Sequence, residues 1–170
     1  PISGKLGLLG ALKAAFRPGE SVAVVESRRN EAGEWKPSVA TIKTLEDWSK
    51  WFGKMQDINR LFQSQIGGAF IGINPLKPGS ASRSNDNVAV FRHVLVEWDD
   101  SGLSLAEQAA KIEASGLPVS VMLTSGGRSV HAWVKVDATT KEEWETRRDQ
   151  LFAKFGCDTK NKDLARVSRW

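Results

Sequence analysis

The sequence contains no tyrosine. Relaxases, rolling-circle initiators and tyrosine recombinases all join DNA covalently to a tyrosine hydroxyl, so these mechanisms are excluded. Cysteine and histidine are scarce too, because Cys157 is the only cysteine and there are two histidines. The chain can therefore form neither an internal disulfide nor a structural zinc site from Cys and His, and we expect a reducing compartment, the cytoplasm.

Long apolar runs are missing as well, since no stretch approaches the roughly 20 residues that a membrane-spanning helix needs. Residues 6–16 have apolar side chains at helical spacing but are interrupted by Lys13, which indicates an amphipathic helix and not a signal peptide. We therefore expect no membrane partner.

The sequence does contain enough apolar material for one core, because 41% of its 170 residues are hydrophobic. We predict a single domain over residues 1–170, with an N-terminal α/β part up to about residue 65 and the functional motifs over residues 88–170. The chain starts at Pro1 without a methionine and stops at Trp170 beside a motif-like stretch, so we expect a domain excised from a longer protein. The net charge of +4, spread along the chain, is compatible with a polyanionic partner.

Patterns of apolar and turn residues predict alternating helices and strands. Helices are expected over residues 6–16, after a cap at Thr44, from the capping box Ser104/Glu107 to Ser115, and from the capping box Thr140/Glu143 to Phe155. Strands are expected over residues 21–25, 68–73, 88–99, 119–123 and 129–136. The predicted fold class is α+β, with an RRM-like mixed or antiparallel sheet that has helices on one face, plus the N-terminal α/β portion.

Two polar stretches are expected to be loops. Residues 28–37 have the composition of a loop or hairpin tip, and residues 74–87 are dense in Pro, Gly, Ser and Asn. Lys77 and Arg83 in the second loop are either solvated or directed at a nucleotide or template.

The first candidate for chemistry is a pair of acids, Glu97 and Asp99, at the end of an apolar strand. Alternation along this strand places Val94 and Val96 on one face and the two acids on the other. Residues two apart on a strand lie about 6.5–7 Å from each other, so their carboxylates can converge on divalent ions about 3.5–4 Å apart, as two-metal phosphoryl chemistry requires. Two solvated acids at a strand end are the alternative, and the neighbouring Asp100 is consistent with it.

The second candidate is the stretch Ser125-Gly126-Gly127-Arg128-Ser129-Val130-His131. Glycines let a backbone approach an anion closely, and Arg128 can offer a bidentate fork to a phosphate. In the strand that follows, Ser129, His131, Trp133 and Lys135 face one way and are expected to line a cleft. A histidine satisfied by a neighbour is the ordinary interpretation of His131 alone, but the adjacent phosphate-binding features favour a hydrogen bond to phosphate.

A third stretch, residues 157–169, supplies further acids and arginines. Taken in order, the three stretches resemble the archaeo-eukaryotic primase superfamily, and more closely the primase-polymerases of phages, plasmids and mobile elements. That family has an acid-x-acid pair ending a strand, then Ser-x-His, then a hydrophobic residue followed by Asp. Here these motifs are Glu97-Trp98-Asp99, Ser129-Val130-His131 and Cys157-Asp158. The sequence departs from the family in two places. Glutamate occupies the first position of the acid pair, where aspartate is commoner, and the sequence stops at Trp170 after an Arg-hydrophobe-Ser-Arg stretch that Pro-Gly usually follows.

The resemblance implies a template-dependent nucleotidyltransferase, a DNA primase or primase-polymerase, that starts or extends primers on single-stranded DNA from NTPs or dNTPs. It implies that Glu97, Asp99 and Asp158 hold two Mg²⁺ or Mn²⁺ ions and that His131 also belongs to the catalytic set. The implied triphosphate ligands are Arg128, Ser129, His131 and Arg166. A helicase domain or replication proteins outside this chain are further expected partners. Asp163 is the rival third metal ligand, and the hydrophobic residue directly before Asp158 favours Asp158.

Two other functions stay open. The same acids could activate water in a metal-dependent nuclease, although a triphosphate-binding stretch has less purpose there. The domain could also be a non-catalytic RRM-like module that binds a single strand by stacking bases on Trp98 and Trp133.

Overall fold

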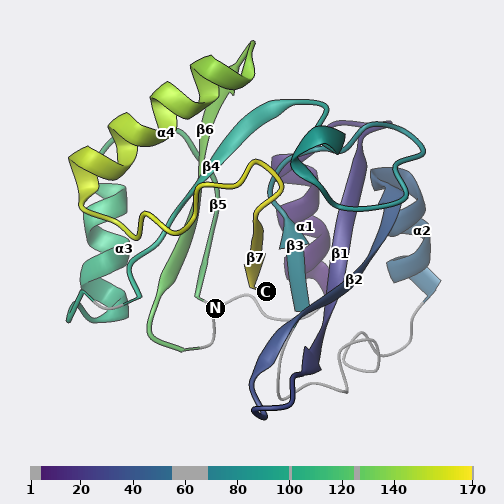
Figure 1. Ribbon diagram of the computed structural model, residues 1–170, viewed down its shortest axis with the longest axis horizontal. Helices are drawn as coiled ribbons and strands as arrows, with labels where there is room; N and C mark the ends of the chain where they lie inside the picture. The colour runs from purple at the N-terminus through teal and green to yellow at the C-terminus, as the bar shows by residue number, and fades with distance from the viewer. Residues whose placement is uncertain (1–4, 55–68, 100, 125–126, 170) are drawn as a thin grey trace.

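The computed structural model describes residues 5–54, 69–99, 101–124 and 127–169. Of the residues named above, Pro1, Gly68, Asp100, Ser125, Gly126 and Trp170 lie outside the described residues. The elements follow in the order α1 (Lys5–Ala15), β1 (Ser21–Arg29), β2 (Trp35–Thr44), α2 (Leu45–Lys54), β3 (Ala69–Gly72), the 3₁₀ helix η2 (Asn85–Asn87), β4 (Phe91–Val96), α3 (Leu105–Glu113), β5 (Val119–Thr124), β6 (Val130–Ala138), α4 (Lys141–Phe155) and β7 (Val167–Arg169) (Figure 1). No helix in these ranges is long and apolar enough to cross a membrane.

The strands form two antiparallel sheets, which confirms the predicted α+β class. Sheet A has the order β2-β1-β3-β7, and sheet B has the order β4-β6-β5. The order of strands and helices in the second half of the chain predicted one RRM-like sheet. The last strand of that half, β7, instead belongs to sheet A, where it pairs with β3 and Ser168 lies opposite Ile71. The C-terminal strand therefore joins the two halves of the chain.

Sheet B is covered on both faces, and its side chains alternate as the sequence predicts. Val94 and Val96 pack with α3 and α4 in one apolar cluster, together with Trp144 and Phe152. Leu95 and Trp133 lie in a second cluster, built with residues of α1, α2 and sheet A, such as Leu8, Leu12 and Trp48. In Figure 1, α3 and α4 lie on the left of the molecule and α1 and α2 on the right.

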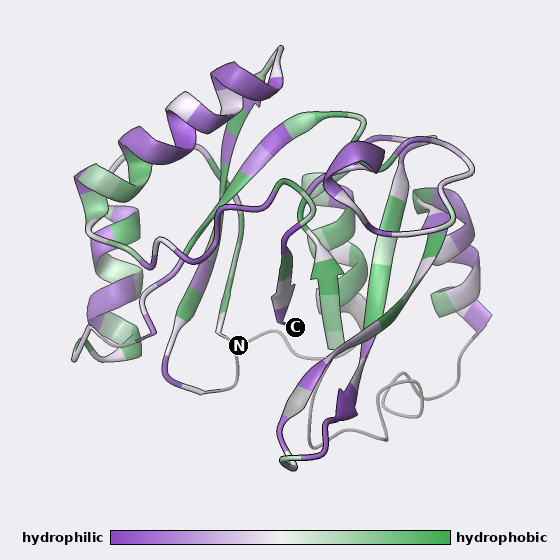
Figure 2. Ribbon diagram, viewed as in Figure 1, coloured by the Kyte–Doolittle hydropathy of each residue, from purple (hydrophilic) through white to green (hydrophobic). Residues whose placement is uncertain are grey.

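Strand β2 was not predicted. β1 runs to Arg29, the turn occupies residues 30–34, and β2 then extends from Trp35 to Thr44. Pro37 lies within β2. Proline has no backbone N–H to donate, and it is tolerated here because β2 is an edge strand of sheet A and has only one neighbouring strand, β1. Figure 2 shows that β1 is hydrophobic within the sheet and hydrophilic toward the hairpin tip.

The segment between β3 and β4 is fixed to its surroundings by side-chain hydrogen bonds. Asn74 is buried and donates from Nδ2 to the carbonyl oxygens of His93 and Leu164, each over 3.0 Å. Lys77 donates to the Asp86 carbonyl over 2.7 Å, and Arg83 donates to the carbonyl of Ala165. Both cations that the sequence left available for a nucleotide or template are thus engaged within the protein.

Candidate active site

Glu97 directly follows β4 and is buried, with 4% of its surface exposed. Its carboxylate forms a hydrogen bond with Nε2 of His131 and accepts another from Nδ2 of Asn161. Nη2 of Arg166 lies 3.7 Å from Oε1 of the same carboxylate. Burial alone would raise the pKa of Glu97, but these donors, His131 foremost, outweigh it and hold the pKa below its usual value. Glu97 is therefore ionised at neutral pH.

His131 is held at both ring nitrogens. Nε2 contacts Glu97, and Nδ1 lies 2.9 Å from Oγ of Ser168, a fully buried residue of β7. The segments around β4, β6 and β7 thus meet at this histidine. His131 and Trp133 of β6 share a face with Ser129, the residue before β6, as predicted, but all three are buried, so the expectation that they line a cleft was wrong. Residues of α1 and α2 pack in one cluster with Trp133, and His131 lies between Glu97 and Ser168.

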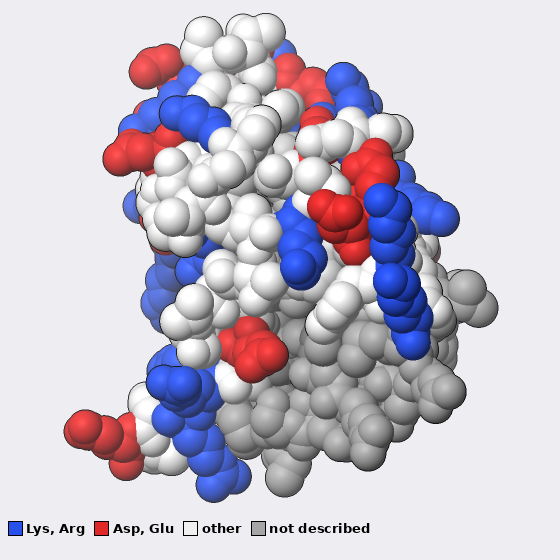
Figure 3. Space-filling view, turned by 90° about the vertical axis from the view of Figure 1, so that its right-hand side faces the viewer, with Lys and Arg blue, Asp and Glu red and all other residues white. Residues whose placement is uncertain are grey.

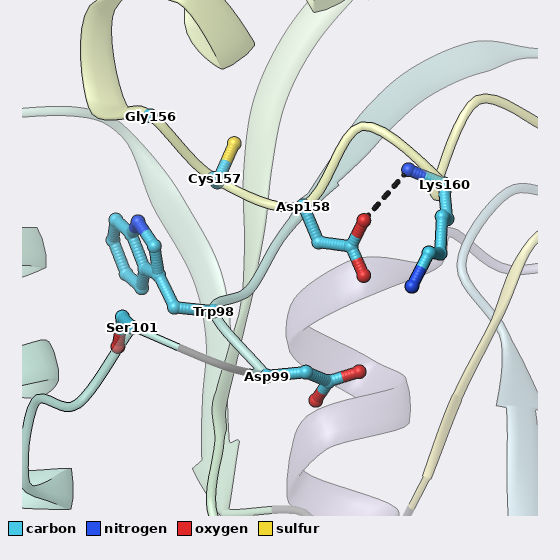
Figure 4. Close-up of a pocket in the computed structure, with 7 residues that line it drawn as sticks. All are labelled: Trp98, Asp99, Ser101, Gly156, Cys157, Asp158 and Lys160. Atoms are coloured by element: carbon cyan, nitrogen blue, oxygen red, sulfur yellow. Dashed lines mark hydrogen bonds between the residues drawn. The ribbon is translucent and has the colours of Figure 1, made fainter.

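Asp99 and Asp158 do line a cavity. It has a volume of about 240 Å³, and its wall consists of Trp98, Asp99, Ser101, Gly156, Cys157, Asp158 and Lys160. Figure 4 shows the two carboxylates extending to the same side from two different segments. The backbone N–H of Lys160 donates to Oδ1 of Asp158 over 2.9 Å, which fixes the rotation of that side chain. Two acids that are far apart in the sequence therefore face one opening.

A larger cavity of about 510 Å³ shares Asp99 and Ser101 with the first one. It continues along Leu103 and the first residues of α3 to Arg128, which is exposed. Arg128 and Asp99 therefore line the same opening, although they lie on separate loops. Ser129 and His131, two further predicted nucleotide ligands, are buried and are not among the residues that line these two cavities.

The acids fit a divalent cation in part. Carboxylate oxygens are the ligands that Mg²⁺ and Mn²⁺ prefer, and those of Asp99 and Asp158 extend to one side of a cavity. The Glu97 carboxylate instead faces His131 and Asn161, and across the described ranges no three His, Cys, Asp or Glu side chains gather closely enough to hold one ion. Glu97 is not among the residues that line the cavity of Asp99 and Asp158.

The rival acid, Asp163, lies elsewhere. It is exposed, and its carbonyl oxygen accepts a hydrogen bond of 3.1 Å from the N–H of Arg166. It does not line either cavity described above. Of the two rival acids, Asp158 therefore shares a cavity with Asp99 and Asp163 does not.

Comparison with known proteins identifies the fold. No protein-family model matches the sequence, and no curated protein matches it. The AEP domain of the primase-polymerase of cyanophage S-2L matches 99% of this chain over 82% of its own length, with a TM-score of 0.63 and 20% identity. The catalytic domain of primase RepB′ in complex with initiator DNA matches 98% of the chain over 76% of its length, with a TM-score of 0.56 and 20% identity. A further structure of RepB′ gives a TM-score of 0.55 at 19% identity, and there the match covers 49% of the longer chain.

The chain has the fold of an AEP domain. The predicted resemblance to the archaeo-eukaryotic primases is thereby confirmed at the level of the fold. Within this AEP fold, Asn161 and Ser168 are buried partners of Glu97 and His131 that the sequence did not reveal. Both lie in the stretch 157–169, but no motif distinguishes them from the other polar residues there.

The charged groups on the outside of the AEP fold are of both signs. Figure 3 shows the right-hand face of the molecule, where Lys and Arg side chains alternate with Asp and Glu among the described residues. Elsewhere in the described ranges, exposed charges of opposite sign form pairs, as Lys36 does with Glu34 and Lys50 with Asp47. This face therefore does not present a continuous basic track over its described part.

Proposed function

We propose that this chain is the catalytic domain of a template-dependent nucleotidyltransferase, a DNA primase or primase-polymerase, that starts or extends primers on single-stranded DNA from NTPs or dNTPs. The observation that carries this proposal is the cavity in which Asp99 and Asp158 meet beside the Glu97–His131 contact. Its occurrence in an AEP fold supports the proposal, since the neighbours in fold are a primase-polymerase and a primase bound to initiator DNA.

The metal ligands that we propose are Asp99 and Asp158. Glu97 is the proposed third ligand, and it would give up a hydrogen bond to His131 or Asn161 when it binds the metal. Two Mg²⁺ or Mn²⁺ ions at such a site supply positive charge that lowers the pKa of a primer 3′-hydroxyl and neutralises a triphosphate. The contribution of this chain is to direct the carboxylates of Asp99 and Asp158 to one opening. Because no step needs a covalent nucleophile, the buried Cys157, whose pKa is raised to about 11 by burial, is assigned no part in the reaction.

The triphosphate ligands that we propose are Arg128, Ser129, His131 and Arg166. Arg128 is the most accessible of them and lines the same cavity as Asp99, so it is assigned the outermost phosphate contact. Both His131 and Arg166 lie against the carboxylate of Glu97. They would donate to phosphate oxygens when Glu97 turns away from them.

The alternative function, a non-catalytic module that binds a single strand by stacking bases on tryptophan, is not supported. Trp98 has 3% of its surface exposed and Trp133 has none. The indole of Trp98 donates to the carbonyl oxygen of Phe155 over 3.1 Å and packs edge-on against the Phe155 ring. Neither tryptophan presents a free face to a base.

The experiment is a nucleotide-addition assay. The purified chain is incubated with labelled single-stranded DNA, with and without an annealed primer, in NTPs or dNTPs and Mg²⁺ or Mn²⁺, and a matched sample contains EDTA. We expect longer products that EDTA abolishes. Products that are only shorter would identify a nuclease, and unchanged DNA that is nevertheless bound would identify a binding module. A helicase domain or replication proteins outside this chain, and a cytoplasmic location, belong to the same proposal.

A further inference from the structure

Gln108 is a buried polar residue on α3, with 1% of its surface exposed. Its side-chain amide makes three hydrogen bonds, all to backbone groups of other segments. Nε2 donates to the carbonyl oxygens of Leu103, over 3.0 Å, and Arg128, over 2.9 Å. Oε1 accepts from the N–H of Val130 over 2.8 Å. Both amide protons and the amide oxygen are thus in use.

Two of the three partners of Gln108 line the larger cavity. Leu103 belongs to the segment that leads from Asp99 to α3, and Arg128 belongs to the loop before β6, and both line the cavity. Val130 is the first residue of β6, so Gln108 binds the backbone on either side of Ser129. A single side chain therefore links the segment that follows Asp99 to the loop that carries Arg128.

Packing or helix capping alone does not account for a glutamine at this position. The N-terminus of α3 is already capped, because Ser104 and Glu107 form a reciprocal capping box. Ile112, one turn further along the same buried face, shows that an apolar side chain suffices for contact with the core. Burying an amide is unfavourable unless its polar groups form hydrogen bonds. At Gln108 all of these hydrogen bonds go to the backbone of Leu103, Arg128 and Val130.

We propose that Gln108 is a positioning residue, which fixes Arg128 and Ser129 relative to Asp99 and thereby sets the spacing between the triphosphate ligands and the metal ligands. This inference rests on the proposed function for its kinetic consequence. Gln108 itself contacts neither substrate nor ion, because it is buried behind the loop. Its effect passes through the backbone of residues 128–130.

The kinetic test compares Gln108→Met with Ile112→Val. Methionine keeps the length and helical preference of the side chain but removes all three hydrogen bonds, whereas Ile112→Val loosens the same helix without touching the loop. We expect Gln108→Met to raise the KM for the nucleotide about tenfold or more while the affinity for the template changes less than about twofold. Ile112→Val should leave the KM unchanged. Equal KM values for Gln108→Met and the wild type would overturn the inference.

A second variant covers the case in which Gln108→Met does not fold. Gln108→Glu retains an oxygen that accepts from the N–H of Val130 but lacks both donors to Leu103 and Arg128. We expect this variant to raise the KM for the nucleotide as well. A wild-type KM in Gln108→Glu would contradict the role proposed for the two donated bonds.

Amide hydrogen exchange tests the same inference without any reaction. In Gln108→Met, the N–H of Val130 should exchange on the order of a hundredfold faster than in the wild type, while that of Val134 in the middle of β6 should change no more than in Ile112→Val. Unchanged protection of Val130 would refute the positioning role. If the wild type adds no nucleotide, the proposed function fails, and the exchange measurement still decides whether Gln108 fixes this segment.

Discussion

The backbone N–H of Asp158 donates a hydrogen bond of 3.0 Å to the carbonyl oxygen of Glu97. This bond joins the segment after β4 to the segment after α4. Asp99 follows Glu97 by two residues, so this hydrogen bond brings the side chains of Asp99 and Asp158 to one cavity. A backbone bond persists when either side chain is changed, so substitution of the acids tests their chemistry and leaves this link intact.

The first prediction concerns these two acids. Asp99→Asn and Asp158→Asn should each lower kcat/KM for nucleotide addition by about a hundredfold or more, because an amide is a poor ligand for Mg²⁺ or Mn²⁺. Binding of single-stranded DNA should change less than about twofold, since the fold and the basic side chains are kept. Steady-state kinetics and fluorescence anisotropy with a labelled strand measure the two quantities.

Asp149→Asn is the matched control for this prediction. Asp149 is an exposed carboxylate of α4 that pairs with Arg148, and its replacement causes the same change of charge away from the cavities. It should retain the wild-type rate. A rate near that of the wild type in Asp99→Asn would refute the role of Asp99 as a metal ligand.

The second prediction separates Asp158 from its rival. Asp163→Asn should keep nucleotide addition within about threefold of the wild type, because Asp163 is exposed and contributes a backbone carbonyl to its bond with Arg166. Measurement of kcat/KM for both asparagine variants under the same conditions decides the matter. Severe loss in Asp163→Asn together with full activity in Asp158→Asn would reverse the assignment.

The third prediction concerns Ser168, which bonds to Nδ1 of His131. Ser168→Ala should lower the free energy of unfolding by about 1 kcal/mol and raise the KM for the nucleotide several-fold, because a ring nitrogen of His131 loses its partner. Urea unfolding and initial rates measure the two effects. Ser49→Ala is the control, since it removes a serine hydrogen bond to the Leu45 carbonyl on α2 and should leave the KM unchanged. An unchanged KM in both variants would exclude a positioning role for Ser168.

The fourth prediction concerns the dependence of stability on pH. Burial lowers the pKa of His93 to about 4, although the carbonyl of Ile73 opposes the shift. An unfolded histidine takes up a proton near pH 6.5, so between these values the unfolded chain binds more protons than the folded one. The contribution of His93 to the free energy of unfolding should therefore be largest above pH 6.5 and fall by up to about 3 kcal/mol as the pH drops toward 4.

A variant isolates this contribution from the other titrating groups. His93→Gln has no proton to gain in this range, so its free energy of unfolding should fall less steeply than that of the wild type between pH 6.5 and 4. Urea unfolding at a series of pH values gives both curves. Parallel curves would mean that His93 is not the source of the pH dependence.

Local patterns in the sequence were sufficient for much of the fold. Ser104 and Glu107 form the predicted capping box, and Thr140 caps α4 with its hydroxyl, although Glu143 returns its bond to Thr139. The alternation around Val94 was also confirmed. Each of these features depends on residues a few positions apart, so the chain encodes them locally.

The features that could not be predicted depend on contacts between distant segments. Ser168 reaches His131 because β7 pairs with β3, and no short pattern specifies that partner. The burial of Glu97 likewise results from Asn161 and His131, which come from separate parts of the chain. The sequence therefore indicated a set of candidate acids but not which of them faces an opening.

Strand β7 has one further consequence, for the order in which the protein assembles. It covers one side of β3, whose other side is paired with β1. Until residues 167–169 have left the ribosome, the apolar strand β3 presents an open edge that can pair with another chain. Completion of sheet A therefore both removes an aggregation hazard and delivers Ser168 to His131, so a nascent chain acquires its candidate site and its protection from misassembly in the same event.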